Sequence, residues 1–470
     1  EEAKMKKNLK KAIAAGMVCT LIISAAAGCG VKKSGGGDGE QVVLKVGNWP
    51  SAELQKEAYE LWEGYLAEMT AKYPNIKVEK DPFNYDYDTF LPSAASGQVP
   101  NVFQVPFTEP KKLVNTGYVA DLSEQFEKYG YKDAFNDSVL DIISSEGKYY
   151  GVPYESSIIG MFYNRNLFKE AGLVNEDGSL IYPKTTDELV QTAVKIKEKT
   201  GKAGFAFPTV DRQGGWAIMS FAWSQGVEFM KQDSDGKWKA TFDSPEMVGV
   251  MQFISDLKWK YNVLPENILL QRTDADQLFG TNQLAMMYGA EFMLKEIFPK
   301  FVLKNDEIST SPVPKGTHGA VSQVGGSIYM CSKDSTPEQL DAAFKWFDVR
   351  GVGPEMNEKT MENKSNEYKV NSETGYIVPP ISYSIYKSPE RLKKENEVIS
   401  NYINVKPEIW NTMYDDSVKI QPEEPVEAQQ LYSVLSSLMQ RVLSDKNVNI
   451  EEIVKEANAN FQSDFLDKLK

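Results

Sequence analysis

The chain of 470 residues has few of the residues and motifs that common catalytic sites require. It contains a single histidine, His318, so an H-E-x-x-H zinc site is impossible. It also lacks G-x-S-x-G, G-x-x-x-x-G-K-[ST] and G-x-G-x-x-G, which mark hydrolase elbows and nucleotide sites. We expect no enzyme, no metal and no cofactor. A carboxylate pair of the glycosidase type has no sequence motif and stays open as a remote alternative.

Cysteine and positive charge are scarce as well. Of the three cysteines, we expect Cys19 to be removed with a signal peptide and Cys29 to be lipidated, so Cys331 is left without an intramolecular partner. The formal net charge is −14, with 52 basic and 66 acidic residues. Nucleic-acid binding needs a basic surface, so we expect no nucleic-acid partner.

No apolar segment is long enough for a membrane span. The candidate at 12–27 follows the basic stretch 5–11, carries no charge and is shorter than the roughly 20 apolar residues a span needs. This pattern predicts a signal peptide over residues 1–28. The sequence Ala26-Ala27-Gly28-Cys29 resembles a bacterial lipobox, which implies lipidation of Cys29. A plain signal peptide with a chance cysteine is the alternative.

The glycine-rich residues 29–40 predict a flexible tether that links this anchor to a folded body. The body begins with a pattern of alternating strands and helices. Strands are expected at 42–49, 76–79 and 102–105, and apolar residues at helical spacing predict a helix from Leu54 to Met69. Such alternation indicates an α/β fold with a largely parallel sheet. Thr185 with Glu188, and Thr336 with Gln339, predict two further helix starts.

Seven sequence blocks then occur in a characteristic order. They are 97–103 (GQVPNVF), 117–122 (GYVADL), 147–154 (GKYYGVPY), 162–173 (FYNRNLFKEAGL), 284–287 (LAMM), 312–314 (PVP) and 325–327 (GGS). In this series the chain resembles the extracellular solute-binding proteins of ABC importers, in the group that includes maltose-binding protein. It departs from that pattern at Asn101, at Glu291-Phe292 where a Trp is usual, and in an insert at 357–372.

The resemblance implies a two-lobe periplasmic-binding-protein-like fold with a ligand cleft between the lobes. We expect one lobe at 41–155 plus 322–378 and the other at 156–321 plus 379–470, with hinge closure around the ligand. The implied function is capture of a saccharide, an oligosaccharide by preference, and its delivery to the permease subunits of an ABC importer. The implied form is a monomer, lipid-anchored at the extracellular face of a Gram-positive bacterial membrane. A peptide, a polyamine or a phosphodiester is the alternative ligand.

A sugar site needs flat aromatic rings for C–H faces and polar side chains for hydroxyls. In this fold such residues follow strand ends. The candidates are Asn48, Trp49, Tyr85, Asp86, Phe107, Glu109, Glu155, Asp211, Arg212, Trp216, Tyr288, Glu291 and Phe292.

Several of these candidates have a plain structural alternative. Trp49 also fits a core position, and Glu155 also fits a hinge cap. The residues Gly214 and Gly215, beside Arg212, are expected to let a loop approach the ligand. The alternation of acids and amides at 84–88 is reminiscent of calcium ligands, but the loop glycine and the final Glu of an EF-hand are missing.

Overall fold

The computed structural model of the protein describes residues 41–297, 301, 303–407, 410 and 412–469. The range Gln41–Lys470 forms one compact unit. The predicted signal peptide at 1–28, the lipidation site at Cys29 and the tether at 29–40 lie outside the described residues.

The body begins with three parallel strands, as the sequence predicts. β1 (Val42–Val46) pairs with β2 (Ile76–Lys80) in a five-residue register, and β1 also touches β3 (Val102–Pro106). The helix α2 (Lys56–Lys72) connects β1 and β2 and ends at Tyr73, before Pro74. The carboxyl ends of these three strands therefore lie at one edge of the sheet, where ligands bind in open α/β sheets.

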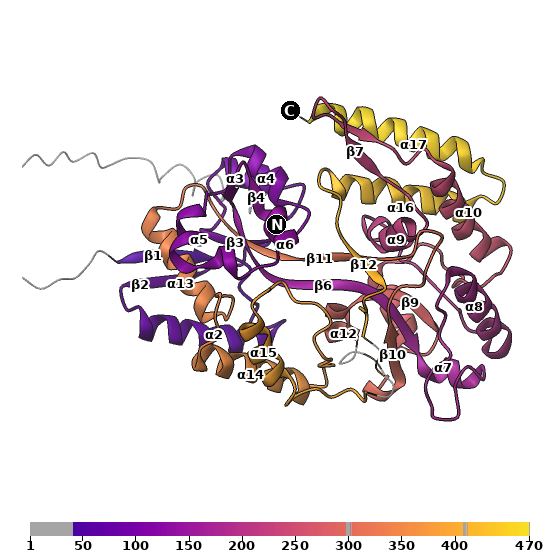
Figure 1. Cartoon of the computed structure of the whole chain (residues 1–470), viewed down its shortest axis with the longest axis horizontal. Coiled ribbons are helices and arrows are strands. Elements are labelled where there is room, and N and C mark those ends of the chain that lie inside the picture. Colours follow the sequence, from indigo (N-terminus) through magenta and orange to yellow (C-terminus); the bar gives the residue numbers. More distant parts are fainter. Residues whose placement is uncertain (1–40, 298–300, 302, 408–409, 411, 470) are drawn as a thin grey trace, which may run out of the picture. The chain divides into compact units, whose positions relative to one another are not determined.

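Two long antiparallel strands form the centre of the molecule. β6 (Gly151–Asn164) pairs with β11 (Ala320–Cys331) from Val324 to Met330. The eight-stranded sheet has the order β10-β6-β11-β3-β1-β2, with β12 (Val418–Pro422) added on β11 and β9 (Met286–Ala290) on β6. β10 (Ile308–Ser311) completes it. Figure 1 shows β6 and β11 running from the group of elements around β1, β2 and β3 to the group around β9 and β10.

Helices cover the faces of this sheet. They are α3 (Phe90–Ala95), α4 (Pro110–Thr116), α5 (Ser123–Tyr129), α6 (Asp137–Ile143), α7 (Arg165–Glu170), α8 (Thr186–Thr200), α9 (Gln213–Ser224), α10 (Pro245–Trp259), α11 (Arg272–Gly280), α12 (Glu291–Ile297), α13 (Pro337–Val349), α14 (Glu358–Glu373), α15 (Pro389–Ile399), α16 (Ala428–Ser444) and α17 (Ile450–Asp464). Two small hairpins pair β4 (Ser144–Ser145) with β5 (Lys148–Tyr149), and β7 (Met230–Gln232) with β8 (Trp238–Ala240).

Both predicted helix caps are confirmed. The Thr185 hydroxyl accepts from the Glu188 N–H before α8, and Thr336 forms a full capping box with Gln339 before α13. One detail differs, because the Glu188 carboxylate accepts from the Lys184 N–H instead of reaching Thr185.

Two hydrophobic cores share the long strands. The first contains apolar residues from Leu44 to Val152 and from Ile328 to Val352, and the second contains those from Ile158 to Val324 and from Val405 to Leu466. We call the elements around the first core the N-terminal lobe and those around the second the C-terminal lobe. The predicted two-lobe α/β fold is therefore confirmed. The expectation of a largely parallel sheet is wrong, because β6 and β11 pair antiparallel with each other and with β3, β9 and β10.

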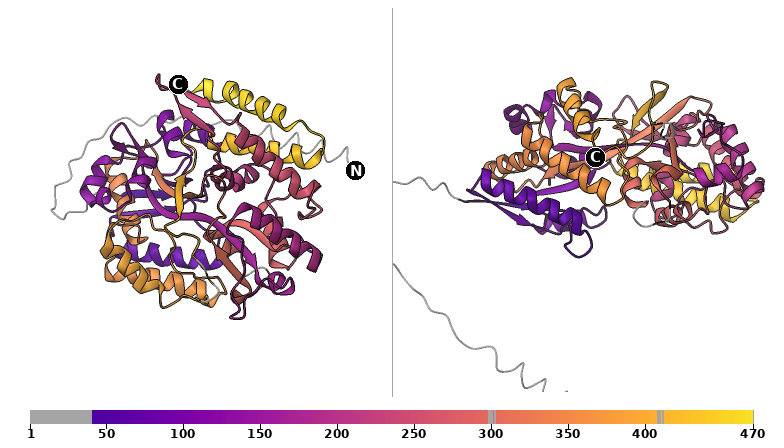
Figure 2. Two further views of the ribbon diagram at one scale, coloured as in Figure 1. Left: turned by 45° about the vertical axis from the view of Figure 1, so that its right-hand side comes forward. Right: turned by 90° about the horizontal axis from the view of Figure 1, so that it is seen from below.

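The exact lobe boundaries stay a prediction, and the core packing differs from them at two places. Val324 and Ile377, expected in the N-terminal lobe, pack in the C-terminal core, whereas Ile385 and Tyr386, expected in the C-terminal lobe, pack in the N-terminal core. The insert at 357–372 forms most of α14, which packs on α15. Its Asn363 donates to Glu68 of α2 at 2.7 Å, so the insert covers the N-terminal lobe (Figure 2).

Candidate functional site

The lobes meet where β11 passes the end of β3. Gly326 lies opposite Ser156 of β6, and its carbonyl accepts from the Phe107 N–H at 3.1 Å. A Cβ atom on Gly326 would lie 2.2 Å from the Glu155 carbonyl oxygen and 2.7 Å from the Phe107 ring. Only glycine allows this close approach, which brings the loop after β3 onto the strands that join the lobes.

Asn48 connects the loops that follow β1 and β2 with strand β3. Its side-chain oxygen accepts from the Gln104 N–H at 2.9 Å, and its amide donates to the Asn84 side chain at 2.8 Å. Its φ of 57° is left-handed, a conformation that Asn tolerates better than most residues. The predicted candidate therefore organises the edge of the N-terminal lobe.

Glu109 is a buried carboxylate at the start of α4. It is 1% exposed, and it accepts from the hydroxyls of Tyr85 and Thr108. Burial raises its pKa, although both hydrogen bonds oppose that shift. Burial and the Glu109 carboxylate together hold the pKa of Tyr85 far above its usual range. The structure thus brings the candidates Tyr85 and Glu109 into direct contact.

Three polar contacts join the two lobes directly. The Arg212 Nη2 atom lies 3.0 Å from Asp88 Oδ2, the Tyr87 hydroxyl donates to Glu427 at 2.9 Å, and the Gln429 amide donates to Thr108 at 3.1 Å. We call this set the inter-lobe bridge; it consists of Tyr87, Asp88 and Thr108 of the N-terminal lobe and Arg212, Glu427 and Gln429 of the C-terminal lobe.

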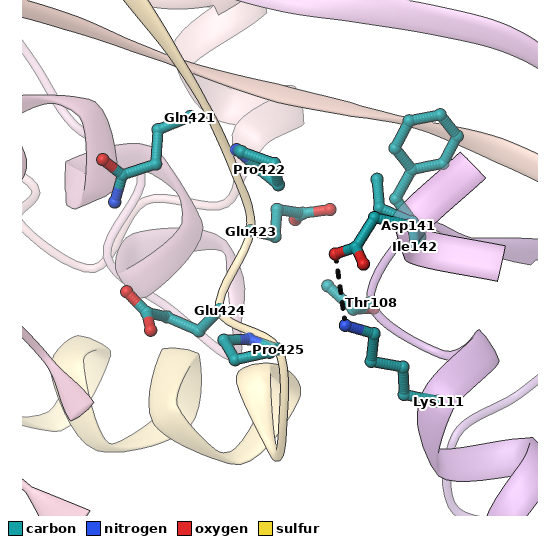
Figure 3. Close-up of a pocket in the computed structure, with 10 residues that line it drawn as sticks. Thr108, Lys111, Asp141, Ile142, Gln421, Pro422, Glu423, Glu424 and Pro425 are labelled. Atoms are coloured by element: carbon teal, nitrogen blue, oxygen red, sulfur yellow. Dashed lines mark hydrogen bonds and ion pairs between the residues drawn. The ribbon is translucent and has the colours of Figure 1, made fainter. Parts of the chain in front are cut away.

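A cavity of about 250 Å³ lies at the junction, next to α4 and α6 (Figure 3). It is lined by Phe107, Thr108, Lys111, Asp141, Ile142, Gln421, Pro422, Glu423, Glu424 and Pro425. Its walls therefore come from the N-terminal lobe on one side and from the segment after β12 on the other. Lys111 and Asp141 form an ion pair of 3.5 Å at its rim.

Among the carboxyl groups that line this cavity, those of Glu423 and Glu424 have raised pKa values. Glu423 accepts from the Tyr432 hydroxyl at 2.7 Å and from the Gln323 amide at 2.9 Å, and its carboxylate points across the cavity (Figure 3). Glu424 accepts from the Trp223 indole N–H at 3.2 Å. Burial raises the pKa of each to about 7, against the effect of these hydrogen bonds. Near neutral pH the cavity wall can therefore both accept and donate hydrogen bonds.

The C-terminal lobe contributes an aromatic pair. Trp216, in the first turn of α9, lies 6.4 Å from Phe292 between ring centroids, and both rings are half-buried. The neighbouring Glu291 accepts from the Ser382 hydroxyl. The structure thus brings the predicted candidate Trp216 next to Phe292 and its neighbour Glu291, although Trp216 lies 75 or more residues from both in sequence.

Three aromatic candidates pack in the hydrophobic cores, namely Trp49, Tyr288 and Phe107, and the last of these also lines the cavity. Trp49 is 7% exposed, with its ring 5.1 Å from Trp62 of α2 and 5.7 Å from Trp346 of α13. Tyr288 is 5% exposed and stacks on Phe207 at 5.6 Å. The turn after β1 suggested exposure of Trp49, but the two helices cover it. Neither the Trp49 ring nor the Tyr288 ring offers a free face.

The remaining candidates lie at the edges of the junction. Phe107 is 5% exposed and packs on Gly326, while Glu155 is exposed on β6 where it leaves the N-terminal lobe. Asp86 accepts from the Thr89 N–H and hydroxyl and so stabilises the turn before α3. Asp211 is exposed, with a φ of 53°. Ligand contact by any of them stays a prediction.

The glycines next to Arg212 serve packing between helices. A Cβ atom on Gly215 would lie 2.2 Å from the Tyr432 carbonyl oxygen, and one on Gly214 would lie 2.9 Å from the Ser436 hydroxyl. Both glycines thus let α9 approach α16. The expectation that they let a loop approach the ligand missed this role, because a pair of helices that meet closely leaves the same sequence pattern.

Sequence reasoning missed the segment between β12 and α16 and the first turn of α16. Glu423, Glu424, Glu427 and Gln429 all lie at the junction of the lobes. A usable signal was present, since Pro422-Glu-Glu-Pro425 places two acids directly before an apolar helix. The strand β12 that positions them has only five residues and was not predicted.

Among the described residues, no group of three or more His, Cys, Asp or Glu side chains is arranged to hold a metal ion. In the same part of the chain, no helix is long and apolar enough to cross a bilayer.

Comparison with known proteins places this architecture in context. The family model described as bacterial extracellular solute-binding protein matches residues 52–349. The arabinooligosaccharide-binding protein of Bacillus subtilis is 28% identical over 248 residues, which is 51% of this chain and 52% of that protein. The chain spans about half the length of the first curated relatives it matches.

Two solved structures share the fold. A solute-binding protein of an ABC transporter from Thermotoga lettingae, bound with α-D-tagatose, has a TM-score of 0.64 at 22% identity and covers 90% of this chain and 99% of its own. The GacH receptor of Streptomyces glaucescens, solved unliganded and with acarbose, has a TM-score of 0.66 at 18% identity and covers 92% and 100%.

Proposed function

Because this chain belongs to the bacterial extracellular solute-binding proteins, we propose that it captures a saccharide, an oligosaccharide by preference, and delivers it to the permease of an ABC importer. The observation that carries the proposal is the family match over residues 52–349. The relative from B. subtilis is named for arabino-oligosaccharides, and the two structural neighbours were solved with α-D-tagatose and with acarbose. The half-buried pair Trp216 and Phe292 supports a sugar because rings of this kind pack on C–H faces.

We also propose that the protein acts as a lipid-anchored monomer at the outer face of a Gram-positive bacterial membrane. The proposal rests on the sequence, in which a signal-like segment at 1–28 ends at the lipobox cysteine Cys29. Two acyl chains on that cysteine would give stable anchoring, whereas one chain binds membranes only marginally. Release of the protein by a Cys29→Ser substitution, measured by cell fractionation, tests the anchor.

A thermal-shift screen tests the ligand class. The probes are mono-, arabino- and malto-oligosaccharides, short peptides, polyamines and glycerophosphodiesters. A ligand that binds only the folded state adds about 2.7 kcal/mol at a hundredfold excess over Kd. A shift with one saccharide series supports the proposal. A shift only with a peptide, a polyamine or a phosphodiester would keep the family and overturn the sugar. Release of reducing ends from a bound oligosaccharide would contradict the expectation that the protein is not an enzyme.

Trp216→Ala tests the aromatic pair within the same screen. We expect a loss of about 1–3 kcal/mol in binding of the saccharide, because a buried aromatic anchor carries that much in typical interfaces. The matched control is Trp238→Ala, a half-buried Trp on the small hairpin of β7 and β8. Equal affinities of the two variants, measured by calorimetry, would remove Trp216 from the site.

A further inference from the structure

The side chain of Arg212 is occupied by the opposite lobe. The sequence suggested that its guanidinium binds ligand hydroxyls, but Nη2 donates to both carboxylate oxygens of Asp88, at 3.2 and 3.0 Å. The guanidinium carbon also lies 4.8 Å from the centroid of the Tyr87 ring. Arg212 thus contacts two consecutive residues of the loop between β2 and α3, across the junction of the lobes.

Tyr87 contacts three charged side chains. Lys112 of the same lobe places its Nζ atom 3.5 Å from the ring centroid, in addition to Arg212. The hydroxyl donates to Glu427 of the C-terminal lobe. Cations near the ring are attracted by its π-electrons. Arg212 and Glu427 both belong to the C-terminal lobe, so this aromatic side chain serves contact between the lobes.

The charges in this group alternate in sign. Asp88 faces Arg212, the two cations flank the Tyr87 ring, and Glu427 receives its hydroxyl. Burial and the Glu427 carboxylate hold the pKa of Tyr87 well above its usual range, so the ring keeps the proton that it donates. The group is neutral as a whole, and all its contacts except that of Lys112 with Tyr87 cross from one lobe to the other.

We propose that Tyr87, Asp88, Arg212 and Glu427 form a latch that sets the ligand affinity of the cleft by stabilising the closed arrangement of the lobes, without touching the ligand. The effect on affinity rests on the proposed function, because a contact that favours the binding-competent state tightens apparent binding by the same factor.

The ion pair of the latch is weak enough to break when the lobes separate. Asp88 is 65% exposed and Arg212 is 32% exposed, so their ion pair is screened by salt and contributes only modestly. We expect Arg212→Ala to weaken apparent saccharide affinity about threefold to tenfold, with a smaller loss at high ionic strength. If Arg212 only contacted the ligand, its substitution would change affinity without changing how closely the two lobes approach each other.

A charge swap tests the latch without any ligand. Small-angle X-ray scattering of the purified protein reports the radius of gyration of Arg212→Asp and of Arg212→Asp combined with Asp88→Arg. The single variant is expected to expand, and the double variant to return toward the wild-type value, because the ion pair is restored in reverse. Tyr87→Phe keeps the ring and removes only the hydrogen bond to Glu427, so it should expand the protein less.

The control is Arg441→Ala. Arg441 forms an ion pair of 2.8 Å with Glu456, with similarly exposed side chains, but both residues belong to the C-terminal lobe. It should leave the scattering unchanged. A double variant as expanded as the single variant, or an Arg212→Asp variant as compact as the control, would overturn the latch.

Titration with arabinotriose measures the ligand affinity of the wild type and of each variant. Weaker binding by Arg212→Asp with recovery in the double variant supports the latch, and equal weakening of both variants assigns Arg212 to ligand contact instead. Failure of the wild type to bind any saccharide would contradict the proposed function and leave the scattering result as an independent test of the latch.

Discussion

At the scale of single residues, the two glutamates before α16 have strongly raised pKa values. Glu423 and Glu424 follow a strand end and are enclosed by the cavity wall and the C-terminal core. An ionised carboxylate loses solvation when it is buried, so the neutral form is favoured and the pKa rises. The hydrogen bonds from Tyr432, Gln323 and Trp223 reduce this effect without cancelling it.

This burial predicts a stability that falls as pH rises. Glu423 has a pKa of about 7 in the folded protein against an ordinary value of 4.5, so folding takes up a proton between these pH values. The free energy of unfolding should therefore decrease from about pH 4.5 to about pH 7 and then level off, by at most roughly 3 kcal/mol for this group. Glu423→Gln keeps an acceptor for Tyr432 and Gln323 but cannot ionise, so urea unfolding at pH 5 and pH 8 should differ less than in the wild type.

The matched control for this experiment is Glu198→Gln, which changes an exposed glutamate of α8. It should keep the pH dependence of the wild type. If Glu423→Gln behaves in the same way as this control, the carboxyl group is not buried in solution as it is in the structure.

At the scale of elements, the contact between α9 and α16 holds Arg212 and Glu427 at the same junction. Gly215 lies against the backbone of Tyr432, and its N–H donates to the Ser436 hydroxyl at 2.9 Å. Backbone atoms of a packed helix cannot rotate away as a side chain can. The distance between the two helices is therefore set by the absence of a side chain at Gly215.

Gly215→Ala should destabilise the protein by about 1–3 kcal/mol or more, because the new methyl group overpacks a tight helix contact. The control is Gly249→Ala in α10, where no atom lies within 4 Å of the added Cβ. That variant should gain about 0.5–1 kcal/mol, since Ala loses less backbone entropy than Gly in a helix. Chemical denaturation measures both, and equal effects of the two substitutions would contradict the packing argument.

At the scale of the whole molecule, the two cores are joined by shared strands. β6 and β11 contribute residues to both cores and pair without interruption, apart from a shift between Ser327 and Ile328. The loop after β3 packs on β11 at Gly326. A change at this point therefore affects the junction of the lobes as well as the stability of either lobe.

Gly326→Ala should lower the thermal unfolding midpoint, because its Cβ would meet the Glu155 carbonyl oxygen and the Phe107 ring. The adjacent Gly325→Ala is the control, since the nearest atom to its Cβ is Glu423 Oε2 at 3.5 Å, an ordinary contact. We expect the control to stay within about 0.5 kcal/mol of the wild type. Calorimetry that finds both variants equally stable would show that the crossing strands can relax around a side chain.

The sequence by itself determined the elements that depend on local order. The strands at 42–46, 76–80 and 102–106, the capped starts of α8 and α13 and the family blocks could all be read from periodicity and motif, because each signal lies within a short stretch of chain. It also identified Trp216, Glu291 and Phe292 as polar and aromatic groups after strand ends, which the fold then brings together.

Only the tertiary structure decided which of the other candidates are buried in a core and which pair with distant residues. Trp49 and Tyr288 became core residues because helices or neighbouring rings cover them, and Arg212 met Asp88, 124 residues away, because the lobes face each other. The role of Gly215 and the position of Glu423 likewise depend on partners far away in sequence. Burial and pairing at a junction between lobes are properties of two surfaces at once, so local patterns cannot encode them.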